Sequence, residues 1–215
     1  MEADGSTSYS FLLLIALVLI TLTAALATSR DLRTYLGTAA TTIFGVMYIG
    51  LAMSCVFPLR FSQVSQGVLR VPGAADPAGG RNLLLLLFLV IWADDTFAYL
   101  VGRTIGRNRL FPSISPKKTL EGSVAGLGGS LLVAWGFTSL FWQTASWKKA
   151  MLLAGIVALF GQIGDLAESA IKRGAGVKDS GSLLPGHVGI LDRVDSTMFA
   201  LPVLYTLSSL LPGGK

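Results

Sequence analysis

Residues 82–101 read NLLLLLFLVIWADDTFAYLV, a predominantly apolar run of 20 residues. A helix of about 20 predominantly apolar residues crosses the hydrocarbon core of a bilayer. Charged residues make up only 13% of the 215-residue chain, whereas soluble domains average about 25%. The composition therefore argues against a water-soluble globule and favours a chain that folds in lipid.

Further apolar runs of similar length lead to the same prediction. We expect an all-α, polytopic transmembrane helix bundle of about six spans. The first run could instead be a signal peptide, but Glu2 and Asp4 precede it without any Lys or Arg, so it is interpreted as a span. The expected spans cover residues 9–28, 38–59, 82–101, 122–142, 150–170 and 197–211.

The distribution of basic residues predicts the orientation of these spans, because cytoplasmic loops carry an excess of Lys and Arg. The loops after the first, third and fifth spans hold 11 such residues, and the opposite side holds 6. The first set is therefore expected to face the cytoplasm or its organellar equivalent. Both long polar loops, 102–122 and 171–196, belong to this set, so their side chains can meet.

Two aspartates, Asp94 and Asp95, interrupt the third expected span. Charges inside spans are costly and usually face the bundle interior. Asp95, Tyr99 and Gly102 recur at near-helical spacing, so Asp95 can share a face with Tyr99 and lie inside the bundle. The alternative is that the pair ends a shorter span in water.

The fifth expected span ends in a polar stripe. Asp165, Glu168, Ser169 and Lys172 follow the spacing i, i+3, i+4, i+7, which places them on one helical face. Two carboxylates, a hydroxyl and an ammonium would then lie close to the cytoplasmic end. The alternative is a solvated last turn in which Glu168 pairs with Lys172.

Another acidic pair, Asp192 and Asp195, stands three residues apart at an expected helix start. Their carboxylates can converge on one cation, and such hard oxygen ligands suit Mg²⁺. With Asp165 nearby, the sequence allows a phosphate-bridged metal site. The alternatives are helix capping for the two aspartates and a structural hydrogen bond for the single histidine, His187.

A basic segment in loop 102–122 offers a partner for phosphate. Ser115 followed by Pro116 fits a helix N-cap with proline at the first helical position, beside Lys117 and Lys118. A helix N-terminus with adjacent lysines is an anion site suited to phosphate. The alternative is the positive-inside rule acting with anionic lipid head groups.

Several function classes are excluded by inspection. The chain has no G-x-x-x-x-G-K-[ST] loop, no complete G-x-G-x-x-G fingerprint, no H-E-x-x-H motif and no cysteine pair for zinc. Loop topology explains the net charge of +5, so no nucleic-acid partner is expected.

In the fourth span, Gly122, Gly126, Gly128 and Gly129 are interpreted as a seam for close helix packing.

The polar segments together resemble one enzyme family. SAIKR at 169–173, KDSG at 178–181, LPGHVG at 184–189 and DRVD at 192–195 resemble the signature of phosphatidate cytidylyltransferases. DTFAYLVGR at 95–103 and SPKKTLEG at 115–122 are similar to other polar segments of that family, in the same order. The resemblance covers about residues 92–196. Val188 departs from the usual His-Gly-Gly, and the chain is shorter than typical bacterial members.

The resemblance implies a reaction of CTP with phosphatidic acid that gives CDP-diacylglycerol and pyrophosphate and requires Mg²⁺, with a second cation as an option. It makes residues 1–81 a region of membrane spans with a connector, and residues 82–215 the catalytic transmembrane region with cytoplasmic polar loops. The implied catalytic residues are Lys172, Arg173, Lys178, Asp179, His187 and Arg193. The implied substrate-binding residues are Ser115, Lys117, Lys118, Thr119, Glu121 and Ser169. The implied metal ligands are Asp165, Asp192, Asp195 and, as a weaker candidate, Asp95.

Three other interpretations stay open at this point. One is a CTP-dependent kinase or transferase acting on another lipid phosphate, and another is an inactive homologue. The third is an ion transporter with Asp94, Asp95, Asp165 and Glu168 as a relay, although these acids gather near one face. We expect an integral protein of a bacterial inner membrane, with a plastid membrane as the alternative, an active site on the cytoplasmic face and a homodimer as an option.

Overall fold

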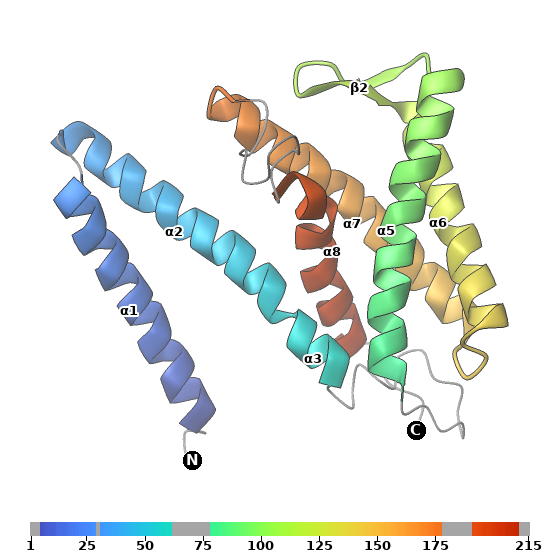
Figure 1. Cartoon of the computed structure of the whole chain (residues 1–215), viewed down its shortest axis with the longest axis horizontal. Coiled ribbons are helices and arrows are strands. Elements are labelled where there is room, and N and C mark those ends of the chain that lie inside the picture. The colour runs from blue at the N-terminus through green and yellow to red at the C-terminus, as the bar shows by residue number, and fades with distance from the viewer. Residues whose placement is uncertain (1–4, 29–30, 62–77, 178–190, 211–215) are drawn as a thin grey trace, which may run out of the picture. The chain divides into compact units, whose positions relative to one another are not determined.

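The computed structural model describes residues 5–28, 31–61, 78–177 and 191–210. It confirms the predicted all-α class, with one small β-hairpin added (Figure 1). The helices are α1 (Gly5–Thr28), α2 (Leu32–Ser54), α3 (Val56–Phe61), α5 (Gly79–Thr104), α6 (Leu120–Leu140), α7 (Trp147–Gly174) and α8 (Leu191–Leu210), and the strands are β1 (Arg109–Phe111) and β2 (Ser115–Thr119).

Over most of its described residues, each expected span is helical. By length and composition, four helical segments could cross a membrane: Leu32–Phe61, Gly79–Thr104, Leu120–Leu140 and Trp147–Gly174; the described part of α1 adds a shorter apolar helix, Leu12–Thr28. The chain is an integral membrane protein, and the count of about six spans stays a prediction.

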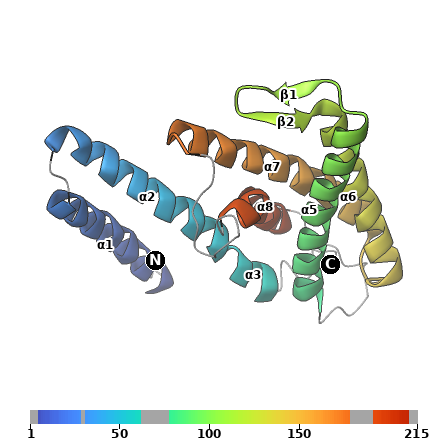
Figure 2. The same cartoon turned by 45° about the horizontal axis from the view of Figure 1, so that its top comes forward.

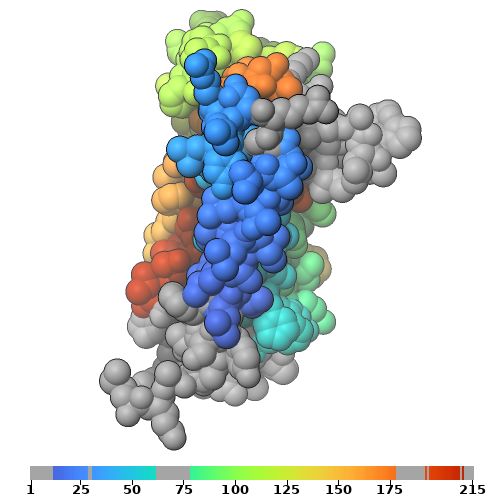
Figure 3. All heavy atoms as spheres, turned by 90° about the vertical axis from the view of Figure 1, so that its left-hand side faces the viewer, coloured from blue at the N-terminus to red at the C-terminus, as the bar shows by residue number. Residues whose placement is uncertain are grey.

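The chain divides into two compact units, Met1–Leu51 and Ala52–Lys215. In the first unit, Tyr35 donates a hydrogen bond from its hydroxyl to the carbonyl of Leu22 at 3.3 Å, which links α2 to α1. Large apolar side chains stay exposed along both helices, with Leu13 at 71% and Leu36 at 72%. In Figure 3 the described side chains of α1 (dark blue) lie on the face turned toward the viewer. Such apolar surfaces are suited to contact with lipid.

The second unit is built around α5, α6, α7 and α8, which alternate in direction along the chain (Figure 1). Its core consists of apolar side chains that are almost fully buried, among them Leu83, Leu87, Leu153 and Leu201. The short helix α3 packs against the start of α5. There Gly80 lies so close to the carbonyl of Arg60 that a Cβ atom would stand 2.1 Å from the oxygen.

The hairpin of β1 and β2 lies at the end of the bundle where α5 ends and α6 begins (Figure 2). Arg109 pairs with Thr119, and Phe111 pairs with Ser115, in antiparallel register. The predicted N-cap at Ser115 is therefore wrong, because Ser115 begins a strand. Thr119 caps α6 instead, and its hydroxyl accepts a hydrogen bond from the backbone N–H of Gly122 at 3.2 Å.

The predicted glycine seam is confirmed at three of its four positions, where α6 packs against α5. A Cβ atom at Gly122 would lie 2.6 Å from the carbonyl oxygen of Ala98, and one at Gly129 would lie 2.4 Å from the ring of Phe97. At Gly126 a Cβ atom would lie 2.6 Å from an Asp94 carboxylate oxygen. Gly128 faces open space, with nothing within 4 Å.

This difference predicts opposite effects of two identical substitutions in α6. Gly126→Ala is expected to lower the free energy of unfolding by about 1–3 kcal/mol, since overpacking forces helix or side chain to move. Gly128→Ala is expected to be neutral or to stabilise the protein, since alanine favours a helix interior by about 1 kcal/mol over glycine. Thermal unfolding in detergent measures both effects. Equal midpoints of thermal unfolding for the two variants would contradict the assigned packing of α5 against α6.

Candidate functional site

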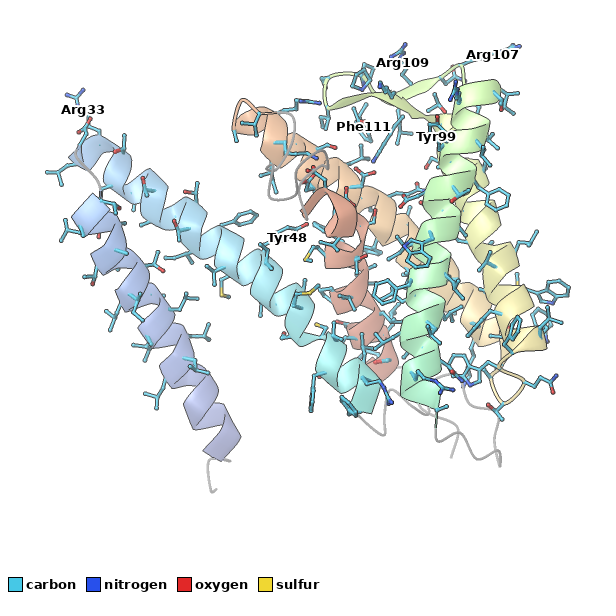
Figure 4. All side chains as sticks on the ribbon, viewed as in Figure 1. Arg33, Tyr48, Tyr99, Arg107, Arg109 and Phe111 are labelled. Carbon is cyan, nitrogen blue, oxygen red and sulfur yellow. The ribbon has the colours of Figure 1, made fainter. Side chains whose placement is uncertain are left out.

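A cavity of about 720 Å³ lies between the hairpin, the C-terminal half of α5, the start of α6 and the middle of α7. Its wall is basic on the hairpin side and acidic toward the helices. The basic lining residues are Arg103, Arg107, Arg109, Lys117 and Lys118, and the acidic ones are Asp94, Asp95 and Asp165. Figure 4 shows Arg107 and Arg109 at the hairpin end of the bundle, where Tyr99 projects from α5.

The hairpin positions the basic wall. The carboxylate of Glu121 accepts hydrogen bonds from the backbone N–H groups of Arg107 and Asn108 at 3.2 Å, and from the Asn108 side chain at 2.8 Å. The Arg109 guanidinium donates to the carbonyl of Pro116, which ties β1 to β2. Glu121, predicted to bind substrate, thus fixes the start of the hairpin and does not line the cavity.

Tyr99 and Arg103 form a second fixed group on the α5 side of the cavity. The Arg103 guanidinium donates to the Tyr99 hydroxyl at 2.7 Å and lies 5.9 Å from the centre of its ring. Because the two residues are one helical turn apart, the cation stays next to the aromatic face. Both side chains line the cavity, and neither was among the predicted site residues.

The acidic wall meets the basic wall through one ion pair. Lys118 of β2 pairs with Asp165 of α7, and both side chains are partly buried. Asp94, which also lines the cavity, is 5% exposed. Helix α5 continues for another nine residues beyond Asp95, so the aspartate pair does not mark a helix end. Lys118 and Asp165, assigned separately from sequence, are therefore neighbours.

A glutamine that the sequence interpretation missed holds the cavity floor together. Gln162 of α7 donates from Nε2 to an Asp94 carboxylate oxygen at 2.8 Å and to the Ser123 carbonyl at 3.0 Å. The Ser123 hydroxyl donates in turn to Oε1 of Gln162. One signal for this residue was available: Gln162 lies one turn before Asp165 in an otherwise apolar part of the span.

A second charged cluster joins α7 to α8. Lys172 pairs with Glu168 at 2.5 Å and also with Asp192. The Glu168 side chain is 1% exposed and that of Asp192 is 9% exposed. The pairing of Glu168 with Lys172 is therefore present, but in a buried setting and not in the solvated last turn of the alternative interpretation. None of the three lines the cavity.

The structure thus brings together only part of the predicted site. Of the predicted residues, those that line the cavity are Asp95, Lys117, Lys118, Thr119 and Asp165. Those that lie outside its lining are Ser115, Glu121, Ser169, Lys172, Arg173, Asp192 and Asp195. The positions of Lys178, Asp179 and His187, and the side chain of Arg193, lie outside the described part of the chain.

The distribution of carboxylates bears on metal binding. Among the described residues, no three His, Cys, Asp or Glu side chains gather closely enough to hold a metal ion by themselves. Mg²⁺ does not require three protein ligands, because it commonly uses one or two carboxylates and completes its coordination shell with water and phosphate oxygens. Asp95 and Asp165 line one cavity and meet that requirement.

Comparison with known proteins agrees with this chemistry. The model of the cytidylyltransferase family matches residues 4–211. The phosphatidate cytidylyltransferase of Staphylococcus saprophyticus is 41% identical over 170 residues, which are 79% of this chain and 58% of the relative. That of Synechocystis sp. is 50% identical over 136 residues, 61% of this chain and 45% of the relative. The matched region thus spans about half the length of these relatives. The chain belongs to the cytidylyltransferase family.

Proposed function

We propose that the protein transfers the cytidylyl group of CTP to the phosphate of phosphatidic acid, giving CDP-diacylglycerol and pyrophosphate. The observation that carries this proposal is the cavity at one end of the membrane helices, where the Lys118–Asp165 pair joins a basic wall to an acidic one. A polyanionic nucleotide and a lipid phosphate match the basic wall. The names of the relatives support the same reaction.

In the proposed reaction, a phosphate oxygen of phosphatidic acid attacks the α-phosphorus of CTP. The bond from the α-phosphorus to the oxygen bridging it to the β-phosphorus breaks, and pyrophosphate leaves with those electrons. Such transfers need little covalent help from the protein, so positioning and charge neutralisation supply most of the catalysis. Arg107, Lys117 and Lys118 would neutralise the phosphate oxygens from the hairpin side.

The cavity has a suitable size and composition for this substrate pair. Ligand sites usually have volumes of about 300–1,000 Å³, and this cavity has about 720 Å³. Asp95 and Asp165 would hold Mg²⁺, which would screen the charge of the phosphates when bound. The acids gather with lysines and arginines at one end of the bundle, whereas an ion relay needs acids through the membrane depth. This distribution favours the enzyme over the transporter.

The location of the site follows from the same charges. The hairpin end of the bundle is rich in basic residues, and basic loops usually face the cytoplasm. We therefore place the cavity on the cytoplasmic face of a bacterial inner membrane. Phosphatidic acid would enter from the membrane and CTP from the cytoplasm. CTP, phosphatidic acid and the bilayer are thus the proposed partners, and a homodimer is a further proposal that light scattering in detergent tests.

The reaction is tested with purified protein in mixed micelles that contain phosphatidic acid. CDP-diacylglycerol is expected to form from CTP only when Mg²⁺ is present, and EDTA is expected to stop its formation until excess Mg²⁺ is added back. Mass spectrometry of the organic phase identifies the product. Undiminished product after EDTA treatment would refute the metal requirement, and no product from folded protein would refute the proposed reaction.

A further inference from the structure

Gln162 is a neutral side chain among the charged groups at the cavity floor. It lies on α7, three residues before Asp165, so both occupy neighbouring positions on one helical face. Its amide contacts α5 through Asp94 and α6 through Ser123. A single side chain therefore connects the three helices that form the floor of the cavity.

Each hydrogen bond of the Gln162 amide has a defined donor and a defined acceptor. Its Nε2 donates to the Asp94 carboxylate and to the Ser123 carbonyl, and its Oε1 accepts from the Ser123 hydroxyl. Reversing the amide would place its oxygen against two acceptors, so the three contacts select one orientation. All three hydrogen bonds are part-buried, and leaving a donor or acceptor unsatisfied there lowers stability.

Asp94 takes part in this junction as an acceptor. Oδ1 of Asp94 lies against Gly126 of α6, where only a residue without a side chain leaves room for the carboxylate. Among the described residues, Gln162 is the one donor that hydrogen-bonds the Asp94 side chain. An asparagine at position 94 would keep an acceptor oxygen for the same Nε2 atom.

We propose that Gln162 is a positioning residue that sets the register of α7 against α5 and α6. It thereby holds Asp165 in the cavity wall that also contains Asp95, and within reach of Lys118. Asp94 contributes the hydrogen-bond acceptor on α5 to this junction. The consequence for catalysis rests on the proposed function, whereas the alignment of the helices does not.

Three variants test whether the hydrogen bond between Gln162 and Asp94 positions the catalytic groups. Gln162→Glu places a carboxylate against Asp94 and is expected to lower kcat by about 10- to 100-fold, because small misplacements of reacting groups are that costly. The KM for CTP should stay within about threefold, since Gln162 does not belong to the basic wall. Asp94→Asn alone keeps an acceptor for Nε2 of Gln162 and is the reference against which the double variant is compared. In the double variant, the amide introduced by Asp94→Asn can donate to the new carboxylate, which should recover a large part of the lost kcat.

Gln143→Glu is the matched control, because it makes the same chemical change at an exposed position between α6 and α7. It should leave kcat unchanged. Gln162→Met removes all three hydrogen bonds at similar volume, and it replaces Gln162→Glu if that variant does not fold. In the double variant the Ser123 carbonyl still lacks its hydrogen-bond donor. Only part of the lost kcat is therefore expected to return.

A distance measurement tests the alignment without relying on activity. Spin labels at Leu100 of α5 and Ile171 of α7, both exposed, are introduced into a Cys55→Ala background. Pulsed electron resonance should give a broader distance distribution for Gln162→Glu than for the parent, and a narrower one again for the double variant. Unchanged distributions, or a kcat that Asp94→Asn does not partly restore, would overturn the proposal. If the parent makes no lipid product, the proposed function fails while the distances still decide the alignment.

Discussion

Asp165→Asn is expected to lower the rate of CDP-diacylglycerol formation by about 10²–10³-fold, the loss typical of removing one electrostatic contact at a transferring group. The substitution keeps the volume of the side chain and removes its charge. Lys118 then loses its ion-pair partner, and the cavity loses one of the two carboxylates proposed for Mg²⁺. Steady-state rates at saturating CTP and Mg²⁺ measure the effect.

Asp31→Asn is the matched control for this loss. Asp31 lies outside the cavity, where its side chain accepts a hydrogen bond from the backbone N–H of Arg33 at 2.9 Å, and asparagine can accept the same bond. This variant should retain the parent rate. Because Asp165 is partly exposed, the Asp165→Asn protein is expected to fold. A folded Asp165→Asn protein with at least half of the parent rate would refute the role of Asp165.

Lys172→Met is expected to cause the largest loss of stability, about 3–5 kcal/mol, because it leaves buried carboxylates without their counter-ion. Lys172 is the cation between Glu168 on α7 and Asp192 on α8. Without it, two negative charges face each other in a buried setting, and the contact between α7 and α8 weakens. Unfolding in a denaturing detergent, followed by circular dichroism, measures the change.

Two further variants separate charge from packing at this cluster. Lys148→Met makes the same change at an exposed lysine near the start of α7 and should leave the unfolding midpoint nearly unchanged. Adding Glu168→Gln to Lys172→Met removes one of the unpaired charges and should recover part of the lost stability. If Lys172→Met is as stable as the parent, the buried ion pairs do not hold α8 in place.

Much of the fold could be predicted from sequence, because the bilayer imposes a simple rule. Long apolar runs must satisfy their backbone within a helix, and run 82–101 indeed lies within α5. The count of basic residues also placed loops 102–122 and 171–196 at one end, as the structure has them for their described parts (Figure 1). The α6 glycines could be assigned to a seam because close helix approach requires small residues.

The hairpin could not be predicted, because local preferences at its residues are ambiguous. Ser115 and Thr119 are both good N-caps, and Pro116 fits either a helix start or an edge strand. Pairing with β1 decides in favour of the strand. That pairing joins residues separated by a turn, and neither segment shows a strong strand pattern by itself.

The charge partners could be predicted only in part. Spacing along one helix correctly paired Glu168 with Lys172, since both lie on one face. Spacing contains no information about neighbours on other helices, so the contacts of Lys118 with Asp165 and of Lys172 with Asp192 were not foreseen. The structure gives Asp192 a lysine partner, and its assignment as a metal ligand stays a prediction. Gln162 carries no charge, so a prediction based on the positions of charged residues did not include it.

The phosphorus atom of CTP that reaches the lipid distinguishes cytidylyl transfer from phosphorylation. The purified protein is incubated with phosphatidic acid, Mg²⁺ and CTP labelled with ³²P at either the α or the γ position, and the organic phase is counted. Cytidylyl transfer predicts lipid-bound label from α-labelled CTP and none from γ-labelled CTP. Label from the γ position would instead show a CTP-dependent lipid kinase and would rule out cytidylyl transfer.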